Sequence, residues 1–336
     1  MKRKHGLMVI LALLIIGIAA LVFQQRRQVP VEERRFLFGT LIRITAYGPG
    51  ASAAVESALR EMERIHSLTS QTDGSVARIN EQAGKTPVHV EPELFAFLQK
   101  VFRMAEDSGG YFNPMIGALV ELWDFDYEGK GRIPSAAEIR QILPLTDQKQ
   151  VALDEKMQTV FLKESGMKID LSGVAKGYAI DRAWEILKNK GMTGALIDGG
   201  ESSIRVLGER PGGGPWRIAV SHPRQSEWIG IVQLTSGQAL GTSADTEHYI
   251  ESNGRRYSHL LNPFTGYPPE DLLAVTIMAD SALIADLYST AVFVAAAADR
   301  GELVASHGLE ALMVDSRLKV VTTPGMEAIL KTEQAD

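Results

Sequence analysis

Apolar and polar positions follow two distinct periods in the first part of the chain after residue 35. Residues 36–47 alternate between apolar and polar side chains, which predicts a strand, and the Gly-Pro-Gly run at 48–50 predicts the turn that ends it. In residues 52–68 apolar side chains recur every three or four positions, which predicts an amphipathic helix with Ser52 as a candidate N-cap. A strand followed by a helix is therefore expected here.

The same periods predict a mixture of helices and strands along the rest of the chain. Helices are expected at 92–108, 136–143, 177–190 and 281–298, and strands at 151–162, 167–171, 195–198, 204–207, 216–220, 229–234, 238–241, 311–314 and 319–322. The two kinds of element do not alternate strictly, which favours an α+β fold over a doubly wound parallel sheet. No repeat or linker interrupts residues 35–330, so one domain is expected over 30–336.

An apolar run of about 17 residues, Leu7 to Phe23, lies between basic residues at 2–4 and 26–27. Its length is at the short limit for a membrane-spanning helix and exceeds a usual signal-peptide core, which favours an uncleaved anchor within 1–29. A cleaved signal peptide, supported by the small residues at 17–19, and a buried core helix are the alternatives. Either membrane interpretation places the rest of the chain on the periplasmic side of the inner membrane.

Charge and cysteine content exclude several kinds of partner and site. Lys and Arg number 35 against 41 Asp and Glu, and this mild acidic excess argues against a nucleic-acid partner, which favours a basic surface. The chain has no cysteine, which excludes a disulfide framework, a thiol nucleophile and a cysteine metal site. The absence of cysteine also suits an oxidising compartment.

Two glycine-containing segments follow predicted strands. The segment Asp170–Asp181 passes from a strand through small residues into a helix, where free backbone amides favour an anion such as phosphate. Its glycine spacing is not that of a Walker loop, and a plain strand-to-helix connection explains it equally well. The second segment, Asp198–Glu201, contains two glycines that permit a close approach, although a simple turn is the preferred interpretation.

Single side chains suggest phosphate and metal chemistry. His259 stands just before a predicted turn at 263–266, where it could contact phosphate or move a proton, although structural histidines are more common. Asp286 and Thr290 lie four apart on an apolar helix, so their side chains face one way. Carboxylate and hydroxyl oxygens suit Mg²⁺, while a hydrogen-bonded Asp–Thr pair in the core is the alternative.

Aromatic residues form a fifth candidate. The segment 112–117 is followed by Leu-Trp-Asp-Phe at 122–125, and Trp123 and Phe125 could stack on a flat ring system. Aromatic residues in such a run more often belong to the core.

Taken in chain order, these segments resemble one family, the FAD:protein FMN transferases, also called ApbE-like flavin transferases. The matching blocks are Phe-Asn-Pro at 112–114, Leu-Trp-Asp-Phe at 122–125, residues 170–181, Gly-Gly at 199–200, Thr-Ser-Ala-Asp at 242–245, His-Leu-Leu-Asn-Pro-Phe-Thr-Gly at 259–266, and Ala285-Asp286 with Thr290. The resemblance covers about residues 35–325. One departure is Ala244, which stands where the family has glycine.

The resemblance implies a fold and an activity. The fold would be a single domain of mixed helices and mostly antiparallel strands. The enzyme would take FAD as substrate and Mg²⁺ as cofactor, and would transfer FMN to a Thr or Ser hydroxyl of an exported flavoprotein, with AMP as the leaving group. A Mg²⁺-dependent FAD pyrophosphatase and a non-catalytic flavin-binding protein are the alternatives.

The resemblance also assigns roles to residues. The metal would be held by the carbonyl of Gly173 and by Asp286 and Thr290. The flavin nucleotide would contact Phe38, Ser75, Trp123, Asp124, Phe125, Lys176 and Ala179, with His259 near the diphosphate. An in-line attack by a hydroxyl needs positioning and charge neutralisation, and a base near the hydroxyl would help. His259 and Asp245 are the candidate bases.

Overall fold

The computed structural model describes residues 29–125 and 131–332. The apolar run at 7–23, with its predicted membrane helix, lies outside these residues. Among the residues described, no helix combines the length and the apolar character that crossing a membrane requires.

A large antiparallel sheet forms the centre of the described chain. Its eight strands run in the order β1-β2-β6-β7-β10-β13-β14-β15, and every neighbouring pair is antiparallel. The strands are β1 (Val31–Leu37), β2 (Thr40–Tyr47), β6 (Gly194–Gly199), β7 (Ser203–Gly208), β10 (Ala239–Ala244), β13 (Leu272–Ala279), β14 (Glu310–Asp315) and β15 (Val320–Thr322). This arrangement confirms the predicted α+β class with antiparallel strands.

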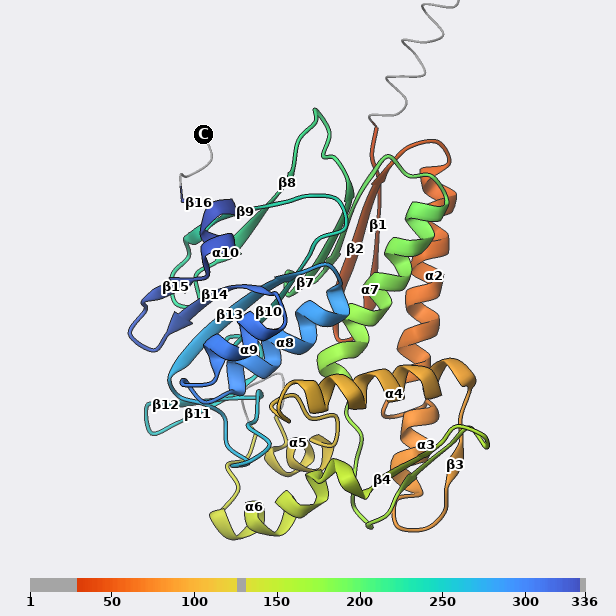
Figure 1. The fold of residues 1–336 in the computed structure, drawn as a ribbon, viewed down its shortest axis with the longest axis vertical. Coiled ribbons are helices and arrows are strands. Elements are labelled where there is room, and N and C mark those ends of the chain that lie inside the picture. Colours follow the sequence, from red (N-terminus) through yellow and green to blue (C-terminus); the bar gives the residue numbers. More distant parts are fainter. Residues whose placement is uncertain (1–28, 126–130, 333–336) are drawn as a thin grey trace, which may run out of the picture.

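Three helices cover one face of this sheet: α2 (Ala51–Thr69), α7 (Ser172–Asn189) and α8 (Ala282–Val294). Figure 1 shows α2 and α7 side by side, with α8 meeting α7 near its first turns. The apolar stripe of α2 is buried against α7 and the sheet, as its sequence period requires. The predicted N-cap Ser52 lies inside α2, because Gly50 occupies the N-cap position.

The other face of the sheet packs against a small sheet of β8 (Trp216–Ser221), β9 (Trp228–Leu234) and β16 (Leu330–Lys331), next to α10 (Pro324–Ile329). Alternate residues of β7 show the division between the two faces. Ile204 and Val206 join the core shared with β8 and β9, whereas Ser203 and Arg205 reach residues of α8 and α7. The face of β7 that carries these two polar residues is the face of the site.

Most of the remaining elements gather at one end of the molecule, whereas α9 lies beside α8 and β14 (Figure 1). The remaining elements are α3 (Ser75–Glu81), α4 (Pro92–Asp107), α5 (Gly117–Trp123), α6 (Ala136–Ile142), the 3₁₀ turns η1 (Leu143–Thr146) and η2 (Gln148–Gln150), β3 (Val88–His89), β4 (Val151–Asp154), β5 (Thr159–Leu162), β11 (Tyr249–Ser252), β12 (Arg255–Ser258) and α9 (Arg300–Ser306). The helix α4 contributes Phe95 and Leu98 to a core that it shares with α8.

The structure differs from the sequence prediction at several elements. The strand expected at 36–47 is a hairpin of β1 and β2, because Phe38 and Gly39 turn with φ of 52° and 75°. The segment 151–162 is likewise a hairpin, of β4 and β5. No strand forms at 167–171, where the backbone of Ile169 instead bonds the Asn80 side chain.

Candidate active site

A cavity of about 370 Å³ lies where the first turns of α7, the middle of α8, the start of β7, the end of β10 and loop 259–263 meet. Seven sequence-predicted residues line this cavity: Phe38, Phe125, Gly173, Lys176, His259, Asp286 and Thr290. Five others do not line it: Ser75, Trp123, Asp124, Ala179 and Asp245. The volume falls within the usual range for small-molecule sites.

Asp286 and Asp170 are buried carboxylates that line the cavity. Oδ1 of Asp286 accepts a hydrogen bond of 2.6 Å from the Ser203 hydroxyl. Burial raises the pKa of Asp286 to about 7, although Lys176 and the Ser203 hydroxyl both favour the charged form. Among the residues described, no arginine, lysine or histidine forms an ion pair with Asp286. A bound cation would therefore meet a carboxylate whose charge is poorly compensated.

Two glycines of α7 bring that helix against the Asp286 side of α8. A β-carbon at Gly177 would lie 2.8 Å from Oδ2 of Asp286, and one at Gly173 would lie 3.7 Å from Oγ1 of Thr290. The Thr290 hydroxyl is also 3.3 Å from that of Ser243 on β10. The structure thus brings together the three residues that the sequence suggested as metal ligands.

The donor set at this crossing suits a hard cation. A carboxylate, a hydroxyl and a main-chain carbonyl are oxygen ligands of the kind that Mg²⁺ takes, with phosphate oxygens and water completing the shell. Within residues 29–125 and 131–332 no cluster of three His, Cys, Asp or Glu side chains could hold a metal ion.

Lys176 supplies the positive charge of the cavity. It lies one turn into α7, and its Nζ donates a 2.5 Å hydrogen bond to the Ser202 hydroxyl. Ser202 and Ser203 follow the turn that contains Gly200 and Glu201. Gly200 has a φ of 71°, and its β-carbon would lie 2.0 Å from Oγ1 of Thr40. Sequence reasoning selected the glycines but missed the two serines, whose position immediately after the turn was the available signal.

His259 is half-buried at the wall of the cavity formed by loop 259–263. Its Nδ1 is 3.1 Å from the carbonyl oxygen of His248, and the two rings meet edge to face with centroids 5.4 Å apart. Burial lowers the pKa of His259, which favours the neutral imidazole at neutral pH. Because Nδ1 must carry the proton to donate to a carbonyl, the lone pair lies on Nε2. His259 can therefore accept a proton.

Asp245 has a different environment. Its carboxylate receives a two-pronged ion pair from Arg224, with Nη1 donating to Oδ1 at 2.7 Å and Nη2 donating to Oδ2. Paired in this way, and outside the cavity lining, Asp245 is poorly placed to remove a proton from a ligand.

Aromatic side chains form another wall. Phe38 lines the cavity with its ring edge-on to His66, at a centroid distance of 4.9 Å. Phe125 lines it too, stacked almost parallel on Trp123 at 5.5 Å. Trp123 is fully buried and its Nε1 donates to the carbonyl of Gly266 at 2.9 Å. Trp123 thus supports Phe125 from behind.

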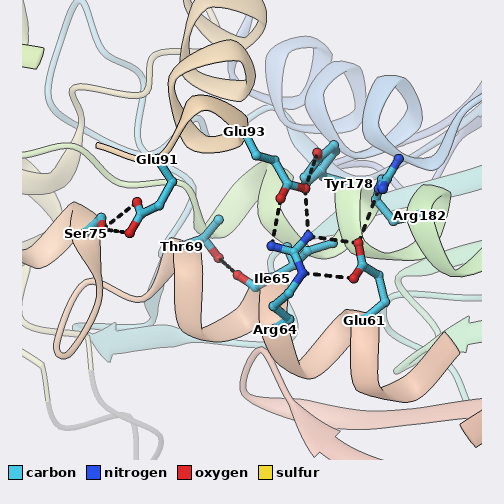
Figure 2. A network of polar contacts seen from close by, with 9 residues as sticks. All are labelled: Glu61, Arg64, Ile65, Thr69, Ser75, Glu91, Glu93, Tyr178 and Arg182. Atoms are coloured by element: carbon cyan, nitrogen blue, oxygen red, sulfur yellow. Dashed lines mark hydrogen bonds and ion pairs between the residues drawn. The ribbon is translucent and has the colours of Figure 1, made fainter. Parts of the chain in front are cut away.

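The other predicted flavin contacts lie away from the cavity. Ser75 begins α3 and donates to Glu91 at 2.9 Å, as Figure 2 shows. Ala179 is buried in the core between α7 and α2. Asp124 ends α5 with a φ of 50°. Their positions give these three residues no direct contact with the space that the cavity encloses.

The sequence profile of the ApbE family matches residues 38–313. A FAD:protein FMN transferase of Klebsiella pneumoniae is 34% identical, over 75% of this chain and 78% of the relative. One from Treponema pallidum is 31% identical, over 77% of this chain and 76% of the relative.

Solved structures give the same result. The crystal structure of an ApbE protein from Thermotoga maritima superimposes with a TM-score of 0.83 at 34% identity, covering 90% of this chain and all of that one. The flavinyl transferase ApbE of Pseudomonas stutzeri, in its apo form, gives a TM-score of 0.78 at 27% identity, covering 90% of this chain and 96% of that one. On the profile match and the sequence identity, this chain belongs to the ApbE family.

Proposed function

We propose that this protein transfers the FMN part of FAD to a threonine or serine hydroxyl of a partner protein, in a Mg²⁺-dependent reaction that releases AMP. The observation that carries the proposal is the buried Asp286 carboxylate, which lines one cavity together with Thr290, Gly173, Lys176 and His259. The names of the relatives, FAD:protein FMN transferases, supply the reaction class.

Different residues of the cavity would contact the flavin ring, the diphosphate and the metal ion. Phe38 and Phe125 can flank the flavin ring, while Lys176 and the first turn of α7 can hold the diphosphate. Asp286, Thr290 and the Gly173 carbonyl would hold Mg²⁺, which when bound neutralises charge on the diphosphate.

The transfer step then needs one nucleophile and one base. The acceptor hydroxyl oxygen attacks the phosphorus of the FMN part, and the bond from that phosphorus to the bridging oxygen breaks. AMP leaves with the bonding electrons, and the hydroxyl proton passes to Nε2 of His259. The low pKa of His259 keeps the imidazole able to accept that proton at neutral pH.

The acceptor is proposed to be an exported flavoprotein carrying a Thr or Ser flavinylation motif. This proposal rests on the apolar run at 7–23, which supports anchoring at the inner membrane with the catalytic domain in the periplasm. Protease added to intact spheroplasts should digest the catalytic domain. Its protection until the membrane is lysed would contradict this location.

A transfer assay with the full chain tests the proposed activity. The reaction contains FAD, Mg²⁺ and an acceptor protein with the motif, and is followed by in-gel flavin fluorescence and intact mass. The expected result is a mass gain of one FMN residue on the acceptor, matched by AMP and lost when the motif hydroxyl is removed. Free FMN and AMP without the mass gain would instead indicate a pyrophosphatase, and bound FAD with neither product a flavin-binding protein.

A further inference from the structure

Asp181 ends the 170–181 segment, and the proposed reaction gives it no role. It lies on α7 one turn beyond Gly177 and two turns beyond Gly173, so all three share a face of that helix. Asp181 does not line the cavity. Its carboxylate accepts four hydrogen bonds, from Arg205 Nη1 at 2.6 Å, Ser281 Oγ at 2.6 Å, Ala282 N at 2.7 Å and Leu283 N at 3.1 Å.

Three of these donors belong to the beginning of α8. The amides of Ala282 and Leu283 have no partner within their own helix, because the first turn of any helix leaves its amides free. The Ser281 hydroxyl donates to Asp181 and itself accepts from the amide of Ile284 at 3.3 Å. A side chain of α7 therefore caps the N-terminus of α8, where a negative charge is favoured.

Arg205 ties this cap to the sheet. From β7 its Nη1 reaches Asp181, its Nη2 donates to the carbonyl of Asp280 at 2.8 Å, and its guanidinium lies 4.1 Å from the Trp184 ring centroid. Ser203, two residues earlier on the same face of β7, donates to Asp286. One strand thus holds both the start of α8 and the carboxylate in its second turn.

The two helices that Asp181 joins share the proposed metal site. Gly173 belongs to α7, whereas Asp286 and Thr290 belong to α8. At the crossing a β-carbon on Gly177 would lie 2.5 Å from the carbonyl oxygen of Ala282, so the backbones meet with no spare room. Mg²⁺ demands near-octahedral geometry at about 2.1 Å, so a small shift of α8 against α7 would weaken its binding.

We infer that Asp181 is a positioning residue, which fixes α8 against α7 and thereby sets the spacing of the metal ligands Gly173, Asp286 and Thr290. This inference rests on the metal site of the proposed function. An Asp181→Asn variant keeps an acceptor oxygen for the amides but loses the charge opposite Arg205. An Asp181→Ala variant loses both.

Glu310 offers a matched control. From β14 it accepts a hydrogen bond of 3.1 Å from the amide of Met326, near the start of α10, and it lies outside the cavity lining. Glu310→Gln therefore makes the same change, from a carboxylate to an amide. It does so at α10, whose first turn is also capped by a side chain from another element. Glu310→Gln leaves α7 and α8 untouched, and it should lower stability less than Asp181→Asn, because Glu310, among the residues described, is not opposite an arginine as Asp181 is opposite Arg205.

The test titrates MnCl₂, as a probe for Mg²⁺, into the FAD-loaded full chain and measures free Mn²⁺ by electron paramagnetic resonance. The Mn²⁺ dissociation constant should rise about tenfold in Asp181→Asn and further in Asp181→Ala, as expected when a group that orients metal ligands is altered. FAD affinity without metal should stay within about twofold, and Glu310→Gln should behave as wild type. Raising the Mg²⁺ concentration should restore most of the transfer rate of Asp181→Asn.

Two results would overturn the inference. If Asp181→Asn lowers stability but leaves the Mn²⁺ affinity unchanged, as Glu310→Gln should, Asp181 is only a structural cap. If the wild-type protein binds FAD but no Mn²⁺, the proposed metal site fails and the role of Asp181 fails with it. Loss of FAD affinity in Asp181→Asn without metal would also contradict the assignment, because the defect would then extend beyond the metal site.

Discussion

A network of charged side chains and a single buried carboxylate both lie beside α7, and their acidic groups are stabilised in opposite ways. The first is the helix network of Glu61, Arg64, Glu93, Tyr178 and Arg182, which joins α2, α4 and α7 (Figure 2). Arg64 donates to Glu61 at 2.9 Å and to Glu93 at 2.8 Å, and these bonds lower the pKa of both carboxyls.

The second is Asp286, which lies against Gly177 of α7. Gly177 immediately precedes Tyr178 of the helix network in the sequence. The Asp286 carboxylate accepts a short hydrogen bond from the neutral Ser203 hydroxyl. Burial raises the pKa of Asp286 to about 7. The helix network thus neutralises its own charges, whereas Asp286 is costly to ionise unless a cation arrives. A buried carboxylate that has a raised pKa, has no ion-pair partner in the described part of the chain and lies beside a cavity indicates a role in function rather than in stability.

Removing the Asp286 carboxylate should have the largest effect on catalysis. Asp286→Ala should lower the FMN transfer rate about a thousandfold, since metal stabilisation of a transferring phosphoryl group is worth several kcal/mol. The rate is measured by in-gel flavin fluorescence at saturating FAD and Mg²⁺. A loss of less than tenfold would mean that Asp286 does not hold the metal.

His259 should come next. His259→Ala should slow transfer about a hundredfold, the usual contribution of a general base, while exposed His89→Ala should have no effect. Because the pKa of His259 is lowered, the wild-type rate should hold at pH 6.5 and fall only under more acidic conditions, where the imidazole becomes protonated. Asp245→Asn should cost less than tenfold, and a larger loss there than at His259 would reverse the assignment.

Lys176 should affect binding more than chemistry. Lys176→Met removes the cavity cation, and the KM for FAD should rise about tenfold, the equivalent of one charged contact to phosphate. Lys190→Met, at the other end of α7, is the control and should leave KM unchanged. An unaltered KM in Lys176→Met would place the diphosphate elsewhere.

The helix network should show the smallest effect, and on stability only. Arg64→Ala should cost about 1 kcal/mol at pH 7, because the network is partly exposed and screened by solvent. The folded pKa values of Glu61 and Glu93 are lowered, so this contribution is present above about pH 4.3 and is lost as pH falls through the folded values.

Urea denaturation at pH 7 and at about pH 3.5 checks this pH dependence. The difference in unfolding free energy between Arg64→Ala and wild type should be smaller at the acidic pH. Arg60→Ala is the control, since Arg60 forms an exposed ion pair with Glu56 on the surface of α2 and its loss should change stability by under about 0.5 kcal/mol. A difference that persists in acid would mean that Arg64 acts through packing rather than charge.

Local patterns predicted the parts of the site that depend on local structure. Asp286 and Thr290 were found because a spacing of four places both on one helix face, and their helix is apolar enough to be recognised. The helix from 177 was found as well, although it begins at Ser172. Motif order in the chain then linked these segments into one family.

Features that depend on tertiary contacts were not predicted. The strand β13 was missed, because its run of mostly apolar residues packs on both faces and shows no alternation. The Ser203–Asp286 and Asp181–Arg205 contacts join residues 83 and 24 positions apart, and no local period indicates such pairs. Ser75 and Ala179 were assigned by family resemblance, and their positions depend on how α3 and α7 pack.

The contrast between the two acidic groups is tested most directly by how Mg²⁺ alters thermal stability at pH 8. Without metal, Asp286→Asn should be more stable than wild type by up to about 4 kcal/mol, because a folded pKa raised to about 7 loses stability as pH rises through that value. Adding MgCl₂ should raise the melting temperature of wild type and leave Asp286→Asn unchanged. Equal stabilisation of both proteins by Mg²⁺ would show that the cation binds elsewhere and would contradict the account.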